Sequence, residues 1–166
     1  MFRRLFYAAA SVRSSTFSPV VQSTCDVLFR RLDADKLNAT KKIFYDWERD
    51  GVVRRSSSQW SSPLHMVKKK DGSWRPCGDF CRLNLATLAD KYPVTNLADF
   101  SANLEGCQVF SKLDLKNGYL QIPLECSARP KTELITPFML FEFCWMPFGL
   151  KNAGMTFQRY MDQLLN

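Results

Sequence analysis

The chain has little histidine and no long hydrophobic run. His65 is its one histidine, and although 46% of the 166 residues are hydrophobic, their runs are short. A helix that crosses a bilayer needs roughly 20 consecutive apolar residues, so we expect no membrane partner. The same hydrophobic content, with 13% aromatic residues, argues against disorder. The length fits one domain or part of one.

Cysteine is present without the spacing that binds metals. No C-x-x-C pair occurs among the six cysteines, and the closest two are Cys77 and Cys81. A structural zinc ion needs four ligands at characteristic spacings. The sequence therefore predicts neither a zinc site nor a disulfide framework. Free cysteines in a reducing compartment indicate an intracellular protein.

Acidic residues are missing from the first 25 positions. This stretch holds Arg3, Arg4 and Arg13 and several serines, and its first acid comes at Asp26. Such a composition is typical of a mitochondrial presequence, and the alternative is an upstream extension without a role. We treat residues 1–32 as a basic N-terminal extension that is transit-like or disordered. The localisation is otherwise not predicted.

The net charge of +7, with a pI near 9.2, suits a polyanionic partner such as nucleic acid. A basic domain with no such partner remains the alternative. Part of the charge lies in the run from Lys68 to Lys70, a pattern that is more often a solvated face.

A β-hairpin is the clearest local feature. Asp71-Gly72 separates two strand-like runs, residues 63–70 and 73–79, and is typical of a tight hairpin turn. Pro76 lacks a backbone N–H, which restricts the returning strand to a sheet edge or a bulge. A basic hairpin with an edge strand is therefore predicted.

Helical and strand patterns alternate along the rest of the chain. A helix is expected from Asp33, suited to cap it, to Gly51, and another after Asn152. Between them we predict a short helix at 96–104, a buried strand at 108–113, a strand at 120–124, and a hairpin of 131–136 with 138–145. Helices interleaved with mostly antiparallel hairpins indicate an α+β domain.

Asp114 follows the predicted strand at 108–113. A carboxylate at the end of a strand is a suitable magnesium ligand, because hard cations prefer oxygen donors on a rigid support. The alternative for an isolated aspartate is a helix cap or a turn residue. One carboxylate rarely makes a metal site, so the position of further acids matters.

Four blocks of sequence stand out along residues 33–166. They are Ser61-Ser-Pro-Leu-His-Met-Val-Lys-Lys-Lys-Asp-Gly-Ser-Trp-Arg-Pro-Cys-Gly-Asp79, Phe110-Ser-Lys-Leu-Asp-Leu115, Pro130-Lys-Thr132 with Ile135-Thr-Pro137, and Met146-Pro-Phe-Gly-Leu-Lys-Asn-Ala153 with Thr156-Phe-Gln-Arg159. In content and order these blocks resemble the reverse transcriptase of gypsy-type LTR retrotransposons. The resemblance implies an RNA-directed DNA polymerase that uses Mg²⁺, an RNA or DNA template-primer and deoxynucleoside triphosphates. It also implies a right-hand polymerase fold, here the fingers hairpin and part of the palm.

The resemblance assigns roles to matching residues. Asp114 would bridge two metal ions, and the Leu115 carbonyl would reach the ion on the nucleotide side. The incoming nucleotide would meet five further residues: Lys69 and Arg75 at its phosphates, Tyr119 under its sugar, and Phe148 with Gly149 lining its pocket. Arginine offers a fork-shaped donor and lysine a point charge, which both suit phosphate.

Three positions depart from the family pattern: Cys81 replaces an arginine, Met139 a glycine, and Gly154 an alanine or proline. The family's second metal motif, an aromatic residue followed one residue later by Asp-Asp, is absent, as is any Asp-Asp pair. We therefore expect an incomplete, C-terminally truncated domain without thumb or ribonuclease H, inactive alone. The alternatives are a domesticated nucleic-acid-binding module and a non-functional truncated product. The oligomeric state is not predicted.

Overall fold

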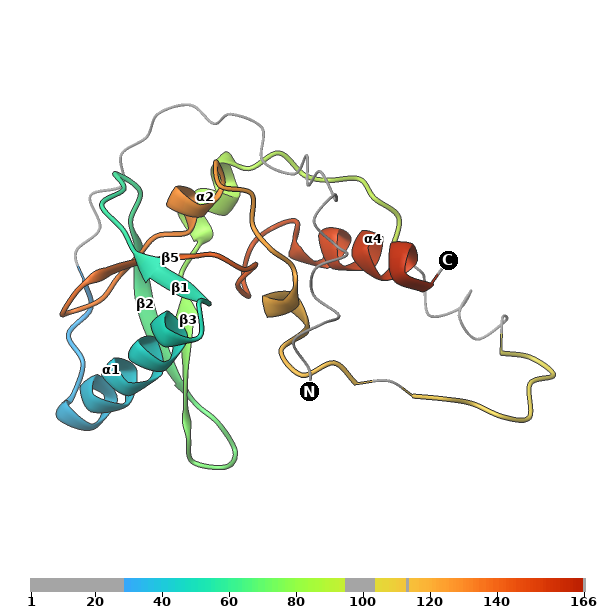
Figure 1. Cartoon of the computed structure of the whole chain (residues 1–166), viewed down its shortest axis with the longest axis horizontal. Coiled ribbons are helices and arrows are strands. Elements are labelled where there is room, and N and C mark those ends of the chain that lie inside the picture. Colours follow the sequence, from blue (N-terminus) through green and yellow to red (C-terminus); the bar gives the residue numbers. More distant parts are fainter. Residues whose placement is uncertain (1–28, 95–103, 113, 166) are drawn as a thin grey trace.

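The computed structural model describes residues 29–94, 104–112 and 114–165, which form a mixed α and β fold around one sheet (Figure 1). The predicted N-terminal extension lies almost wholly outside these residues, as does the helix predicted at 96–104. Within the described residues, no helix is both long and apolar enough to cross a membrane.

Five strands form the sheet in the order β1-β5-β4-β2-β3. Their bounds are β1 Val53–Arg55, β2 Ser62–Lys68, β3 Trp74–Gly78, β4 Leu134–Ile135 and β5 Leu140–Phe143. Neighbours pair antiparallel except β2 and β4, which are parallel. The β4–β5 hairpin thus lies between β1 and β2, and β3 forms an edge, as Pro76 predicts.

The β2–β3 hairpin confirms the turn prediction. Asp71 accepts hydrogen bonds from the Ser73 N–H and hydroxyl at 2.9 and 2.7 Å, and Gly72 has a φ of +81°. Such a φ favours glycine, which lacks the Cβ that would clash. The Lys69 N–H closes the loop with the Ser73 carbonyl at 2.8 Å. This short loop holds the lysine run at the tip of the hairpin.

Helix α1, Ala34–Arg49, confirms the first predicted helix and lies across the sheet (Figure 1). Phe44 is its central contact and is fully buried, with ring centroids 4.9 Å from Phe141 in β5 and 5.4 Å from Trp47. Further along, Lys36 Nζ lies 5.5 Å from the ring centroid of Trp74 in β3. The apolar stripe of α1 therefore covers strands far apart in sequence.

The hairpin of β4 and β5 also confirms its prediction, with Leu134 opposite Phe141. Its turn is closed by the Thr136 hydroxyl, which donates to the Met139 carbonyl at 2.6 Å and accepts from the Met139 N–H at 3.0 Å. Two short 3-10 helices, η1 Gly118–Gln121 and η2 Arg129–Thr132, precede it.

Two predicted strands are wrong. Residues 108–112 are exposed and irregular, and the predicted strand at 120–124 is replaced by η1 and an isolated bridge from Pro123 to Trp145. A strand needs a neighbour to satisfy its N–H and C=O groups. None of the strand pairings within the described residues reaches 108–112. The composition of this run favours a strand, but composition alone does not provide a neighbouring strand to pair with.

Helix α4, Ala153–Leu165, begins at the predicted position after Asn152. The Asn152 carbonyl accepts from the Thr156 N–H at 3.0 Å, but its side chain bonds to the chain near Leu88. Gly154 lies in α4 with open space where a Cβ would be, so packing does not explain its departure from the family pattern.

Two buried carboxylates anchor the serine-rich connector between β1 and β2. Glu142 accepts from the Arg54 guanidinium and from the Ser56 hydroxyl, the latter at 2.9 Å. Glu133, 1% exposed, accepts from the Ser58 N–H at 2.9 Å. Burial, with a smaller contribution from the Glu142 charge, raises the pKa of Glu133 above its ordinary value of 4.5.

Glu133→Gln is expected to stabilise the protein at pH 8 by about 1 kcal/mol, because it removes a buried charge and keeps an oxygen for Ser58. Folded Glu133 holds its proton to higher pH than unfolded Glu133, so wild-type stability falls as pH rises from 4.5 through the raised pKa. Urea unfolding at pH 5 to 8 measures this difference. The exposed Glu125→Gln is the control, and an equal pH trend in wild type and Glu133→Gln contradicts the assignment.

Candidate functional site

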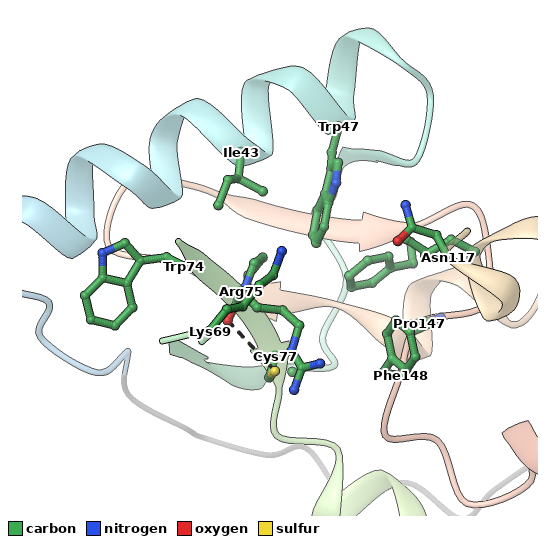
Figure 2. A pocket seen from close by; sticks show the side chains of 13 residues that line it. Ile43, Trp47, Lys69, Trp74, Arg75, Cys77, Asn117, Pro147 and Phe148 are labelled. Carbon is green, nitrogen blue, oxygen red and sulfur yellow. Dashed lines mark hydrogen bonds between the residues drawn. The ribbon is translucent and has the colours of Figure 1, made fainter. Parts of the chain in front are cut away.

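A pocket of about 370 Å³ lies where α1, the β2–β3 hairpin, the η1 segment, the end of β5 and the loop before α4 meet (Figure 2). Its lining combines cationic and aromatic side chains and comes from segments more than 100 residues apart: Ile43, Trp47, Lys69, Trp74, Arg75, Pro76, Cys77, Gly78, Asn117, Leu120, Phe143, Pro147 and Phe148. Such a mixture suits a ligand with a charged end and a flat end.

Lys69 and Arg75 supply the positive charge. Lys69 lies at the hairpin tip and Arg75 on β3 opposite Val67, so the hairpin register places both at one side of the pocket. Both are exposed, and neither forms an ion pair with any carboxylate of the described residues. Two cations without such partners are available to an anionic ligand.

Phe148 supplies an aromatic face on the side of the pocket away from the α1–β3 contact (Figure 2). Its side chain is 48% exposed, and the Tyr119 ring meets it edge-on with centroids 5.1 Å apart. Tyr119 in turn packs on Phe157 of α4, 5.3 Å away. Tyr119 therefore lies behind Phe148 and does not line the pocket itself.

Gly149 shapes the turn that presents Phe148. Its φ is +93°, and a Cβ there would lie 3.5 Å from the Phe80 ring and 3.6 Å from the Gly78 carbonyl oxygen. The positive φ, more than lack of space, requires glycine. This turn brings the segment before α4 against the end of β3.

Asp114 and Leu115 are not among the residues that line the pocket. Both are exposed in the irregular segment before η1, although Asn117, two residues after Leu115, does line it. The structure thus gathers Lys69, Arg75 and Phe148 in one pocket, with Gly149 and Tyr119 next to them, and the two predicted metal-binding residues do not line it.

The donor set does not fit a two-ion centre. Among the described residues, no three His, Cys, Asp or Glu side chains cluster closely enough to hold a metal ion. Two dications a few ångströms apart repel, and a single exposed carboxylate cannot offset that repulsion. The metal-binding roles of Asp114 and Leu115 remain predictions.

Trp47 and Ile43 were missed as pocket residues. Both are partly buried hydrophobic residues of α1 that pack against the core. Trp47 is partly buried against Phe143, with ring centroids 5.8 Å apart. No local signal separates an aromatic residue that packs in a core from one that lines a pocket at its margin.

The family model described as reverse transcriptase (RNA-dependent DNA polymerase) matches residues 67–166, which include the hairpin tip and Phe148. The chain belongs to the reverse transcriptase family. This confirms the resemblance deduced from the four sequence blocks.

Relatives of this reverse transcriptase segment include retrotransposon polyproteins. It is 40% identical over 123 residues to the retrovirus-related Pol polyprotein from transposon gypsy of Drosophila melanogaster, covering 70% of this chain and 12% of that protein. The polyprotein from transposon opus gives 40% over 121 residues, with the same coverage. An RNA-directed DNA polymerase homolog of Oenothera berteroana is 40% identical over 93 residues, 56% of this chain and 66% of that protein. The chain spans about an eighth of the two polyproteins.

Proposed function

We propose that this chain forms the nucleotide-binding side of a reverse transcriptase and holds an incoming deoxynucleoside triphosphate in the pocket between the β2–β3 hairpin and Phe148. One observation supports this above others: Lys69, Arg75 and Phe148, assigned to the nucleotide from the sequence, line one pocket. Template-directed DNA synthesis, the activity of the full-length relatives, is proposed for the larger protein to which this segment would belong.

The chemistry of the pocket suits this ligand. Arg75 can donate two parallel N–H bonds to phosphate oxygens, and Lys69 adds a mobile charge at the hairpin tip. The volume of about 370 Å³ lies in the range of roughly 300–1,000 Å³ usual for small-molecule sites. Phe148, exposed and supported by Tyr119, offers a flat face to the sugar and base.

The architecture proposed for the larger protein is the right-hand polymerase. In that arrangement β2–β3 belongs to the fingers, and β4, β5 and α4 belong to the fingers and part of the palm. Asp114 and the Leu115 carbonyl would contribute to binding Mg²⁺ there, where the ion would neutralise charge on the triphosphate. Residues 33–166 would be the polymerase portion of this chain.

A nucleic-acid-binding module without catalysis is the second candidate. Lys68, Lys69 and Lys70 are all exposed on the hairpin tip, an arrangement suited to a phosphate backbone. Such a module would bind single-stranded RNA with strong salt dependence and would show no preference for a triphosphate over a monophosphate.

Arg75→Gln is expected to weaken dTTP binding by about 10- to 100-fold, because it removes a charge-assisted hydrogen bond to phosphate. Isothermal titration of the purified chain with dTTP and with dTMP measures the effect, which should be larger for dTTP. Arg82→Gln, at an exposed arginine outside the pocket, is the matched control. Equal affinities of wild type and Arg75→Gln would contradict the proposal.

A further inference from the structure

Two asparagines tie the segment after β3 to the segment before α4. Asn84 of helix α2, Cys81–Ala86, contacts the turn that follows Phe148. Its Nδ2 donates to the Gly149 carbonyl at 2.7 Å, and its Oδ1 accepts from the Lys151 N–H at 2.8 Å. One side chain thus satisfies both a carbonyl and an N–H on either side of Leu150.

Asn152 makes the reverse arrangement. Its Nδ2 donates to the Leu88 carbonyl at 2.8 Å, and its Oδ1 accepts from the Asp90 N–H at 3.0 Å. Between the two asparagines, Lys151 Nζ donates to the Thr87 carbonyl at 2.8 Å. We name these five hydrogen bonds, made by Asn84, Lys151 and Asn152, the asparagine clasp.

The clasp acts where apolar packing is weak. Phe148 is half exposed and Gly149 has a positive φ, so neither residue is fixed by a large buried surface of its own. Leu150 and Asn152, by contrast, are 8% and 6% exposed. Without Asn84, the Gly149 carbonyl and the Lys151 N–H would lose the side chain that fixes the direction of the turn.

The neighbouring charges extend the clasp into α4. Arg159 donates to the Asp90 carboxylate at 2.8 Å and lies 4.5 Å from the Tyr92 ring centroid. The Tyr92 hydroxyl donates to Asp162 at 2.9 Å. These contacts connect the segment around Asp90 and Tyr92, which bonds to Asn152, to helix α4.

We propose that Asn84 is a positioning residue of the nucleotide pocket, which orients the Phe148–Gly149 turn toward the sugar and base of a deoxynucleoside. The inference rests on the proposed nucleotide function and deepens it. Asn84 does not line the pocket itself and acts through the backbone that carries Phe148. The phosphate-facing residues Lys69 and Arg75 belong to the hairpin, whose turn is closed independently of Asn84.

Because Asn84 acts on the Phe148 turn and not on the hairpin, its replacement should weaken the binding of some ligands and not of others. Asn84→Ala should weaken binding of deoxythymidine and of dTTP by a similar factor of about 5 to 20, since two hydrogen bonds that orient the turn are lost. Binding of inorganic tripolyphosphate, which meets the hairpin residues, should be unchanged. NMR titration of each probe against the folded chain yields the three dissociation constants.

Amide hydrogen exchange supplies a readout that needs no nucleotide. In Asn84→Ala the Lys151 amide should exchange about 5 to 100 times faster, because its acceptor is gone. In Asn84→Asp the same amide keeps an oxygen acceptor and stays protected, while the Gly149 carbonyl loses its donor. Asn38→Ala, at an exposed asparagine of α1, is the control for both measurements.

Each outcome is decisive. An equal loss of affinity for tripolyphosphate and deoxythymidine, or an unchanged Lys151 exchange rate in Asn84→Ala, overturns the positioning role. If Asn84→Ala does not fold, Asn84→Asp must show the same split between probes. If wild type binds none of the probes, the proposed nucleotide function fails, and the exchange rates alone decide whether Asn84 fixes the turn.

Discussion

Primer extension by the purified chain, with Mg²⁺ and four deoxynucleoside triphosphates, is expected to be no faster than extension by its Asp114→Asn variant. The sequence contains no Asp-Asp pair, and Asp114 is exposed in an irregular segment and does not line the pocket. Catalytic groups that act as a unit lose nearly all their effect when one is removed, by roughly 10⁴- to 10⁶-fold. A pocket that binds a nucleotide does not by itself activate a primer hydroxyl.

A gel assay with a labelled primer measures this rate, with a commercial reverse transcriptase on the same template as the positive control. Wild type and Asp114→Asn should give the same background. DNA synthesis that depends on Asp114 would contradict the argument and would require a metal site made in a different arrangement. Nucleotide binding, tested separately with Arg75→Gln, is independent of this outcome.

Phe44→Ala is expected to lower the free energy of unfolding by about 3–5 kcal/mol, the usual cost of removing a buried aromatic ring. Phe44 is 0% exposed, and its ring packs with Trp47, Phe138 and Phe141 at centroid distances of 5.4, 6.4 and 4.9 Å. These contacts join α1 to the β4–β5 hairpin. Since domains are stable by only about 5–15 kcal/mol, the variant should be largely unfolded or close to it.

Urea unfolding followed by tryptophan fluorescence measures the loss. Tyr45→Ala is the matched control, because Tyr45 neighbours Phe44 in α1 but is 49% exposed and should cost much less. Similar losses in the two variants would show that α1 does not form the core contact. A stable Phe44→Ala protein would lead to the same conclusion.

Local signals in the sequence predicted the elements that form within a few residues. Asp71-Gly72 encodes its turn through a side-chain acceptor and a positive φ, and the stripe around Phe44 encodes one face of α1. Lys69 and Arg75 were assigned from the resemblance to the family, and the hairpin register places them on the same side of the pocket. The family was evident from motif order, which survives where individual positions such as Cys81 have changed.

Features that depend on contacts between residues far apart in sequence could not be predicted from local signals. The run at 108–113 has a strand's composition, but only a paired neighbour makes a strand. Asn152 precedes a helix as a cap would, yet its side chain bonds to Leu88 and Asp90. Trp47 lines the pocket because residues of β3 and Phe143 lie near it in the folded chain. Each outcome depends on segments that meet only in the folded chain.

The insertion of β4–β5 between β1 and β2 sets the order in which the sheet can be completed. Val53 pairs with Phe143, 90 positions later, and Ser62 with Leu134, 72 positions later, whereas β2 and β3 pair across one short loop. On a ribosome the β2–β3 hairpin emerges early with one side unpaired, and it stays so until β4 follows. Closing such long loops is slow. The nascent chain therefore carries open strand edges until residues 134–143 have been made, and chaperones and neighbouring chains compete for these edges in that interval.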